Sequence, residues 1–398
     1  MRKFAVVISL LGLSVVFAVS CSKSDEIATP SDPYAAIRAT FGTNIDPDNL
    51  ANYAGQGHPA YITLDNSGSN VITNAKATLG RVLFYDKKLS INNTVACGSC
   101  HKQEFAFSDT ARISAGVEGG VTFRHSMRLV NARFAAETKF FWNERAASLE
   151  QQTTMPIQDH AEMGFSGQSG RPGLDSLLRK LQSTNYYNEL FRFVYGDINV
   201  TEARMQECLA QFVRSIQSFD SKFDAGRSQV ANDNVPFPNY TPEENAGKQL
   251  FNTPPQFGPN GVRIGGGAGC AGCHKAPAFD IDPNTRNNGI IATTTGVGND
   301  IAITRAPSLR DVVRQSGALN GPLMHTGNVT SLRGAITHYD SNITLNPANT
   351  NLDPRLTPGG VPQRLNLTTT EFDNLIAFLR TLSGSNVYTD SKWKNPFQ

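Results

Sequence analysis

The chain has 398 residues, with 36 Lys and Arg against 34 Asp and Glu, so its formal net charge at pH 7 is only +2. A chain this close to neutrality has no excess positive charge with which to attract nucleic acid, and we expect no nucleic-acid partner. Its length is enough for about two domains.

The first twenty residues have the features of a secretory signal. Arg2 and Lys3 form a basic start, and Phe4–Val19 is an apolar run too short to span a bilayer comfortably. The pattern predicts a lipoprotein signal peptide over residues 1–20, after which Cys21 becomes the acylated first residue. The alternative is an ordinary cleaved signal next to an incidental Cys. We expect a periplasmic protein held to a bacterial envelope membrane through lipid alone, since no later apolar run is long enough to span it.

The remainder of the chain divides by composition. Residues 21–50 are polar and rich in Ser, Asp and Pro, which predicts a flexible tether. Residues 51–230 and 231–398 are expected to form an N-terminal and a C-terminal domain, because the Pro- and Asn-rich stretch from Gly226 to Tyr240 has the composition of a linker.

The secondary-structure signals in these domains are mostly helical. Thr241 with Glu244, and Thr368 with Glu371, have the spacing of a capping box at the start of a helix. Alternating strand patterns are scarce. The sequence therefore predicts a mainly α fold of small helical domains joined by long loops.

Each predicted domain carries one Cys-x-x-Cys-His motif, the pattern that attaches haem c. In this motif the two thiols add to the porphyrin vinyl groups and the adjacent histidine is placed to bind the iron. A zinc site would need four convergent ligands, whereas each motif offers three in haem order. We therefore expect two covalently bound haem c groups in two cytochrome c-like haem domains, attached through Cys97, Cys100 and His101 in the first and Cys270, Cys273 and His274 in the second.

The two halves also repeat one another outside the motifs. Gly80–Phe84 precedes the first motif as Gly247–Phe251 precedes the second, each with Gly at the start and Leu-Phe at the end. Further along, Leu149 follows Ala-Ser and Leu332 follows Thr-Ser. A repeat of this length indicates duplication of one supersecondary unit.

The repeat predicts that the two haems differ. A haem with two strong axial ligands transfers electrons, whereas a haem with one open face can bind and split a peroxide. Seven residues after the repeated Leu, the first half has Pro156, which cannot bind iron, and the second half has Tyr339, which can. Met324 and His338 are rival sixth ligands that the sequence does not separate from Tyr339. Residues 102–124 contain no His, Met, Tyr or Cys that could cap the first haem, so we expect that haem to be open.

Glu162 is a candidate base near the open face. Cleavage of H2O2 needs a group that takes a proton from one oxygen and returns it to the other, and a carboxylate in a mostly apolar pocket can do this. Taken alone, a glutamate in such a loop is more often a solvated carboxylate.

Four strings resemble the bacterial di-haem cytochrome c peroxidases and their MauG relatives. They occur in the same order, with compatible spacing, between about Ala75 and Ser383. The strings are Leu79–Asp86, Phe141–Ala146, Glu162–Gly164 and Arg305–Arg310.

The resemblance implies roles for five residues. Trp142 matches the tryptophan between the haems, an electron relay. Gln152 and Glu162 match the distal glutamine and the catalytic glutamate, and Pro156 matches a proline of the distal pocket. Tyr339 falls where peroxidases that require reductive activation carry a Met and where MauG carries a ligating Tyr.

The chain departs from the family pattern at two places. The His that caps the peroxide-binding haem in activation-requiring members is absent between His101 and Arg124. The calcium site between the domains uses an Asn side chain where this chain has His125, and the carbonyls that it would add come from Asn320 and Pro322. One calcium ion is thus an open alternative.

These features predict a periplasmic di-haem peroxidase that reduces H2O2 to water. Electrons would come from a small c-type cytochrome or similar donor protein, enter at the His274 haem and pass Trp142. The first alternative is a MauG-type enzyme that oxidises residues of a partner protein. The second is a di-haem electron carrier without turnover. A homodimer is compatible with the sequence.

Overall fold

The computed structural model describes Met1 and residues 32–397, so the predicted signal peptide and Cys21 lie outside the described residues. The fold is mainly α, as predicted. Within residues 32–397, no helix combines the length and apolar character needed to cross a bilayer. The helices are α1 (Ala35–Phe41), α2 (Asn74–Tyr85), α3 (Cys97–Cys100), α4 (Leu149–Gln158), α5 (Leu174–Gln182), α6 (Asn185–Tyr195), α7 (Glu202–Ser215), α8 (Lys222–Arg227), α9 (Pro242–Asn252), α10 (Leu332–Ser341) and α11 (Thr369–Arg380).

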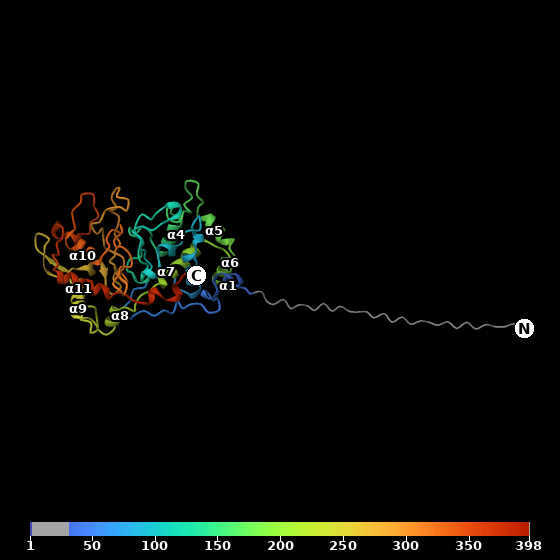
Figure 1. The fold of residues 1–398 in the computed structure, drawn as a ribbon, viewed down its shortest axis with the longest axis horizontal. Helices are drawn as coiled ribbons and strands as arrows, with labels where there is room; N and C mark the ends of the chain where they lie inside the picture. Colours follow the sequence, from blue (N-terminus) through green and yellow to red (C-terminus); the bar gives the residue numbers. More distant parts are fainter. Residues whose placement is uncertain (2–31, 398) are drawn as a thin grey trace.

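Strands are few and short. The antiparallel pair β1 (Pro255–Phe257) and β2 (Arg263–Gly266) follows α9, and the pair β3 (His274–Lys275) and β4 (Asp280–Ile281) follows the second haem motif. The two predicted capping boxes begin α9 and α11, where Thr241 and Thr368 each accept a hydrogen bond from the backbone N–H three residues on. Long loops join the helices (Figure 1).

The buried apolar residues form two clusters. The two parts of the chain that carry them lie side by side in Figure 1. The first cluster runs mainly from Ile37 to Ile216 and the second from Phe223 to Leu382. The predicted boundary at residue 230 is therefore slightly late, because α8 packs into the second cluster through Phe223.

The repeated sequence corresponds to the same helix crossing in both halves. Helix α2 crosses α7, and a Cβ added to Gly80 would lie 2.0 Å from the carbonyl oxygen of Cys208. Helix α9 crosses α11, and a Cβ added to Gly247 would lie 1.9 Å from the carbonyl oxygen of Asn374. Each glycine therefore lets two backbones touch.

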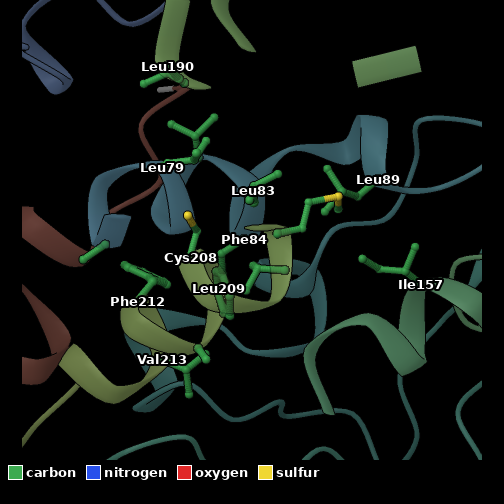
Figure 2. Packing of buried hydrophobic residues seen from close by; sticks show 14 of the residues in the cluster. Leu79, Leu83, Phe84, Leu89, Ile157, Leu190, Cys208, Leu209, Phe212 and Val213 are labelled. Carbon is green, nitrogen blue, oxygen red and sulfur yellow. The ribbon is translucent and has the colours of Figure 1, made fainter. Parts of the chain in front are cut away.

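The phenylalanine that ends each repeated string packs on a phenylalanine of the crossing helix. Phe84 packs on Phe212 with ring centroids 5.1 Å apart, and Phe251 packs on Phe378 at 5.2 Å. Figure 2 shows Phe84 among the side chains that fill the α2–α7 contact, beside the buried Cys208.

The tether prediction over residues 21–50 is wrong from Ala35 onward. Helix α1 packs on α6, and its Ile37 and Phe41 are 0 % and 3 % exposed. The Glu189 carboxylate accepts hydrogen bonds from the N–H groups of Ala36 and Ile37, at 3.0 and 2.9 Å, and so caps the helix. Two apolar residues four apart within a polar stretch are enough to dock this short helix.

The C-terminal domain prediction is wrong at its end, because the last residues return to the first half. Trp393 is buried in the first cluster and donates from Nε1 to Ser215 Oγ at 3.2 Å. Tyr53 Oη donates to Lys392 O at 2.5 Å, and Arg81 Nε donates to Lys394 O at 2.6 Å. The two halves are thus joined by the chain end as well as by the linker.

Candidate active site

The first haem motif lies on the wall of a cavity of about 710 Å³. Helix α3 consists of the four residues Cys97–Cys100, and both thiols and His101 line the cavity. His101 Nδ1 lies 3.1 Å from Phe107 O and must donate to it, since a carbonyl only accepts. Burial lowers the pKa of His101, so its ring is neutral and Nε2, which then carries no proton, can bind a metal.

The second motif lines a separate cavity of about 720 Å³. Its cysteines lie at a turn of 3-10 helix (Cys270–Gly272), and His274 begins β3. Burial lowers the pKa of His274 to about 4, so its ring is neutral and keeps an unprotonated nitrogen. Both cavities are within the usual range for small-molecule sites, roughly 300–1,000 Å³.

Arg128 supplies a further test of whether haem c fits. It lines both cavities, and its Nη2 donates to Ser308 O at 2.9 Å. Among the described residues, its buried Nε has no hydrogen-bond partner. Within the described part of the chain Arg128 forms no ion pair, although the more distant Asp311 charge acts in its favour. The propionate groups of haem c would supply a negative charge close to its guanidinium. The cysteines, the histidines and this arginine therefore fit two haem c groups.

The two cavities share one wall, and Trp142 lies in it. Trp142 Nε1 donates to His125 O at 2.7 Å, and its own carbonyl accepts from the N–H groups of Thr304 and Arg305, both at 3.0 Å. These bonds fix the indole between the two sites, where the relay prediction needs it. The residues that line both cavities are His125, Ser126, Met127, Arg128, Trp142, Arg305 and Pro307.

Helix α4 brings the predicted distal residues to the first cavity. Gln152 and Pro156 lie one turn apart on this helix, and both line the cavity. Pro156 has no N–H, so it cannot make the helical hydrogen bond to the Gln152 carbonyl and offers no atom that could bind iron. From residues 102–124, only Ala115, Thr122, Phe123 and Arg124 reach the cavity, and none has a haem-ligating side chain.

Glu162 lies in the loop after α4 and also lines the first cavity. Asp159 Oδ1 accepts from the N–H groups of Ala161 and Glu162, at 2.8 and 3.0 Å, and holds the loop in place. Burial, helped by the Asp159 charge, raises the pKa of Glu162 to about 7, although Arg145 and Arg124 act in the opposite direction. A carboxyl group with this pKa exchanges protons readily near neutral pH.

Sequence reasoning did not single out the two arginines beside Glu162. Arg145 stacks on Phe141, with its guanidinium 3.4 Å from the ring centroid, and Arg124 pairs with Asp300 of the second half at 2.8 Å. Arg145 lies within the Phe141–Ala146 string, which was the available signal. The Arg124 pair joins loops that are far apart in the chain, and no local pattern indicates it.

Helix α10 places Tyr339 at the second cavity. Met324 lines the same cavity, so both stay candidates for the sixth ligand. His338 is not among the described residues that line it, and its Nε2 lies 2.8 Å from Asn288 O. The ring of His338 is thus directed to the backbone of a neighbouring loop.

The calcium prediction is not tested by these contacts. His125 Nδ1 lies 3.1 Å from Ala111 O, and Asn320 Nδ2 donates to Asp311 O and Tyr388 Oη, both at 2.7 Å. The carbonyls of Asn320 and Pro322 stay the predicted ligands.

The chain is similar in sequence to several known proteins. Residues 74–231 match the family model described as di-haem cytochrome c peroxidase. The MauG protein of Methylophilus methylotrophus is 28 % identical over 327 residues, which cover 79 % of this chain and 84 % of that protein. The cytochrome c551 peroxidase of Nitrosomonas europaea is 24 % identical over 329 residues, 77 % of this chain and 80 % of that protein.

Solved structures show the same fold. A MauG-like protein associated with microbial copper homeostasis superposes with a TM-score of 0.63 at 26 % identity, over 86 % of this chain and 99 % of that one. The di-haem peroxidase BthA of Burkholderia thailandensis, as a Y463M variant, gives 0.60 at 21 % identity, over 85 % and 94 %. Fold and site together fit a protein that holds two haem groups. Residues 74–231 thus match a di-haem cytochrome c peroxidase domain, and most of the chain is similar in sequence both to MauG proteins and to cytochrome c peroxidases.

Proposed function

We propose that the protein is a lipid-anchored periplasmic peroxidase that converts H2O2, two electrons and two protons into two water molecules. The electrons would come from a small c-type cytochrome or a similar donor protein. The observation that carries this proposal is the difference between the cavities. At the same position of equivalent helices, Pro156 leaves the first cavity open and Tyr339 places a phenol in the second.

The chain would hold its cofactors through the two Cys-x-x-Cys-His motifs, with His101 and His274 as iron ligands. The bound haems would supply the redox-active iron that splits the O–O bond. In the first cavity, Pro156 leaves space for H2O2, and the Gln152 amide can orient it by hydrogen bonding.

Glu162 would act as the proton carrier of the site. Its raised pKa lets the carboxylate accept a proton from one peroxide oxygen and, as the acid, deliver it to the other. The neighbouring Arg145 and Arg124 favour the carboxylate form and so keep the base available near neutral pH.

Electrons would enter at the second cavity and reach the first through the shared wall. Trp142 is the large aromatic side chain of that wall, and its ring also meets His325 edge to face at 6.1 Å. Acylation of Cys21 would keep the enzyme at the membrane, near its electron donors.

A MauG-type reaction, in which residues of a partner protein are the electron source, is the second candidate. It is favoured by Tyr339 and by the absence of a capping residue in 102–124. A di-haem carrier without turnover is less well supported, because it would need a sixth ligand where Pro156 lies.

The first test is haem content and turnover. A pyridine haemochrome assay should give two haems c per chain, retained on extraction with acidified acetone. The same preparation should oxidise a reduced c-type cytochrome when H2O2 is added. A single haem, or extractable haem, contradicts the cofactor assignment. Two haems without cytochrome oxidation contradict the peroxidase proposal and favour the MauG-type reaction, which is then assayed as oxidation of a partner protein.

A further inference from the structure

Asn288 lies between the two candidate sixth ligands of the second haem. It belongs to the loop between β4 and α10 and lines the second cavity. Its side-chain nitrogen Nδ2 is 3.4 Å from Met324 Sδ and also 3.4 Å from Tyr339 Oη. One amide group therefore contacts both atoms that compete for the iron.

The orientation of this amide is determined by its surroundings. Asn288 Oδ1 accepts a hydrogen bond from Ile290 N at 3.0 Å, which leaves Nδ2 directed toward the cavity. The main chain of Asn288 is held as well, because its carbonyl accepts from His338 Nε2 at 2.8 Å. The amide has two N–H groups, one for the phenol oxygen and one for the sulfur.

The two hydrogen bonds have unequal effects on the competing ligands. A donor stabilises an anionic oxygen, such as that of an iron-bound phenolate, far more than a neutral acceptor. A thioether sulfur is only a weak acceptor, so the second N–H stabilises Met324 much less than the first stabilises a phenolate. Met324 also has a backbone φ of +64°, a region that non-glycine residues rarely adopt.

We propose that Asn288 selects Tyr339 over Met324 as the sixth ligand of the second haem. The proposal rests on the proposed haem site and deepens it. A phenolate ligand stabilises ferric iron, whereas a Met ligand raises the reduction potential. Asn288 would therefore be a positioning residue that keeps the second haem at low potential without touching the iron.

Asn288→Asp is the sharpest test, because aspartate keeps the acceptor for Ile290 N but loses both donors. We expect the second haem to exchange Tyr339 for Met324, seen as loss of the phenolate-to-iron absorption, gain of thioether ligation and a rise in midpoint potential. The combined variant Asn288→Asp with Met324→Leu should then show a high-spin second haem. The first haem serves as an internal control, since Asn288 does not line its cavity.

Asn351→Asp is the matched control. Asn351 donates from Nδ2 to Ile301 O at 3.2 Å on a neighbouring loop outside both cavities, so this variant should keep the wild-type spectrum. If Asn288→Asp does not fold, Asn288→Leu tests the same loss of donors and should give the same exchange.

Two results would overturn the proposal. One is a second haem whose spectrum and potential are unchanged in every folded Asn288 variant. The other is a wild type in which Met324→Leu, with Asn288 intact, already removes the sixth ligand. The spectrum and the midpoint potential of the second haem are both measured without peroxide turnover. If the protein binds two haems but lacks peroxidase activity, the proposed function is contradicted, and the role of Asn288 can still be tested.

Discussion

Helices α4 and α10 are the same structural element used twice, with different chemical results. Each has ten residues, and each begins after a serine whose hydroxyl accepts from a backbone N–H of the first turn, from Gln151 for α4 and from Gly334 for α10. The eighth residue of each helix lines a cavity, and it is Pro156 in one and Tyr339 in the other. The duplicated scaffold therefore presents a proline to one cavity and a phenol to the other at the same helix position.

The two cavities also differ in the state of their carboxylates. In the second cavity the carboxylate of Asp353 is paired with Arg355 at 2.6 Å. In the first, Glu162 faces Arg145 and Arg124 without an ion pair to either in the described part of the chain, and burial raises its pKa to about 7. Among the described residues that line the two cavities, Glu162 of the first is thus the carboxyl group whose pKa suits it to moving protons near neutral pH.

The equivalence of Pro156 and Tyr339 is tested most directly by placing a tyrosine at the position of the proline. Pro156→Tyr should place a phenol at the open haem, and the new N–H can complete the helix by bonding to the Gln152 carbonyl. We expect peroxide turnover to fall to background and both ferric haems to become low-spin by electron paramagnetic resonance. Pro156→Ala, which adds no ligand, should keep turnover. A Pro156→Tyr variant that stays high-spin and active contradicts the equivalence of the two positions.

Removing the proton carrier should have the next largest effect. Glu162→Gln keeps the shape but not the base, so kcat/KM should fall by roughly 10²-fold or more, the scale of general acid–base groups. Because the carboxylate form accumulates as pH rises through the raised pKa of about 7, wild-type kcat/KM should rise over this range, and the variant should lack the rise. The exposed Glu104→Gln is the control. Unaltered turnover in Glu162→Gln would remove the residue from the mechanism.

Removing the Tyr339 phenol should open the coordination site of the second haem. The wild-type ferric protein should show one high-spin and one low-spin haem, and Tyr339→Phe should convert the second to high spin while leaving the first unchanged. Since residues 102–124 offer no capping ligand, the first haem should react with H2O2 without prior reduction. If the wild type has two low-spin haems that react only after one-electron reduction, then both haems have a sixth ligand and the predicted difference between the halves is wrong.

Each half has a helix crossing that depends on a glycine. Gly80→Ala and Gly247→Ala each place a methyl group about 2 Å from a backbone oxygen, so both should lower the free energy of unfolding by about 1–3 kcal/mol. Denaturant unfolding, compared with Gly57→Ala, where a Cβ meets nothing within 4 Å, measures this. A neutral effect in one half alone would mean that the two crossings are not equivalent.

Local patterns predicted the parts of this protein that depend on residues close together in the chain. The haem motifs place two thiols and a histidine within five residues, and the capping boxes at Thr241 and Thr368 begin α9 and α11 as expected. The spacing from the repeated Leu located Pro156 and Tyr339 on equivalent helices. The same reasoning failed where packing between distant segments decides, as for α1 and for the chain end around Trp393.

The sequence by itself determined the helical fold class and the difference between Pro156 and Tyr339, and it predicts the two haem attachment sites, because each depends on residue type at a fixed local spacing. Only the tertiary structure decided that Trp142 and Arg128 lie in one wall between the cavities, that Asn288 contacts both candidate ligands, and that Glu162 is buried enough to have a raised pKa. Desolvation, charge and hydrogen bonding depend on neighbours in space, and in this fold those neighbours come from opposite halves or distant loops of the chain.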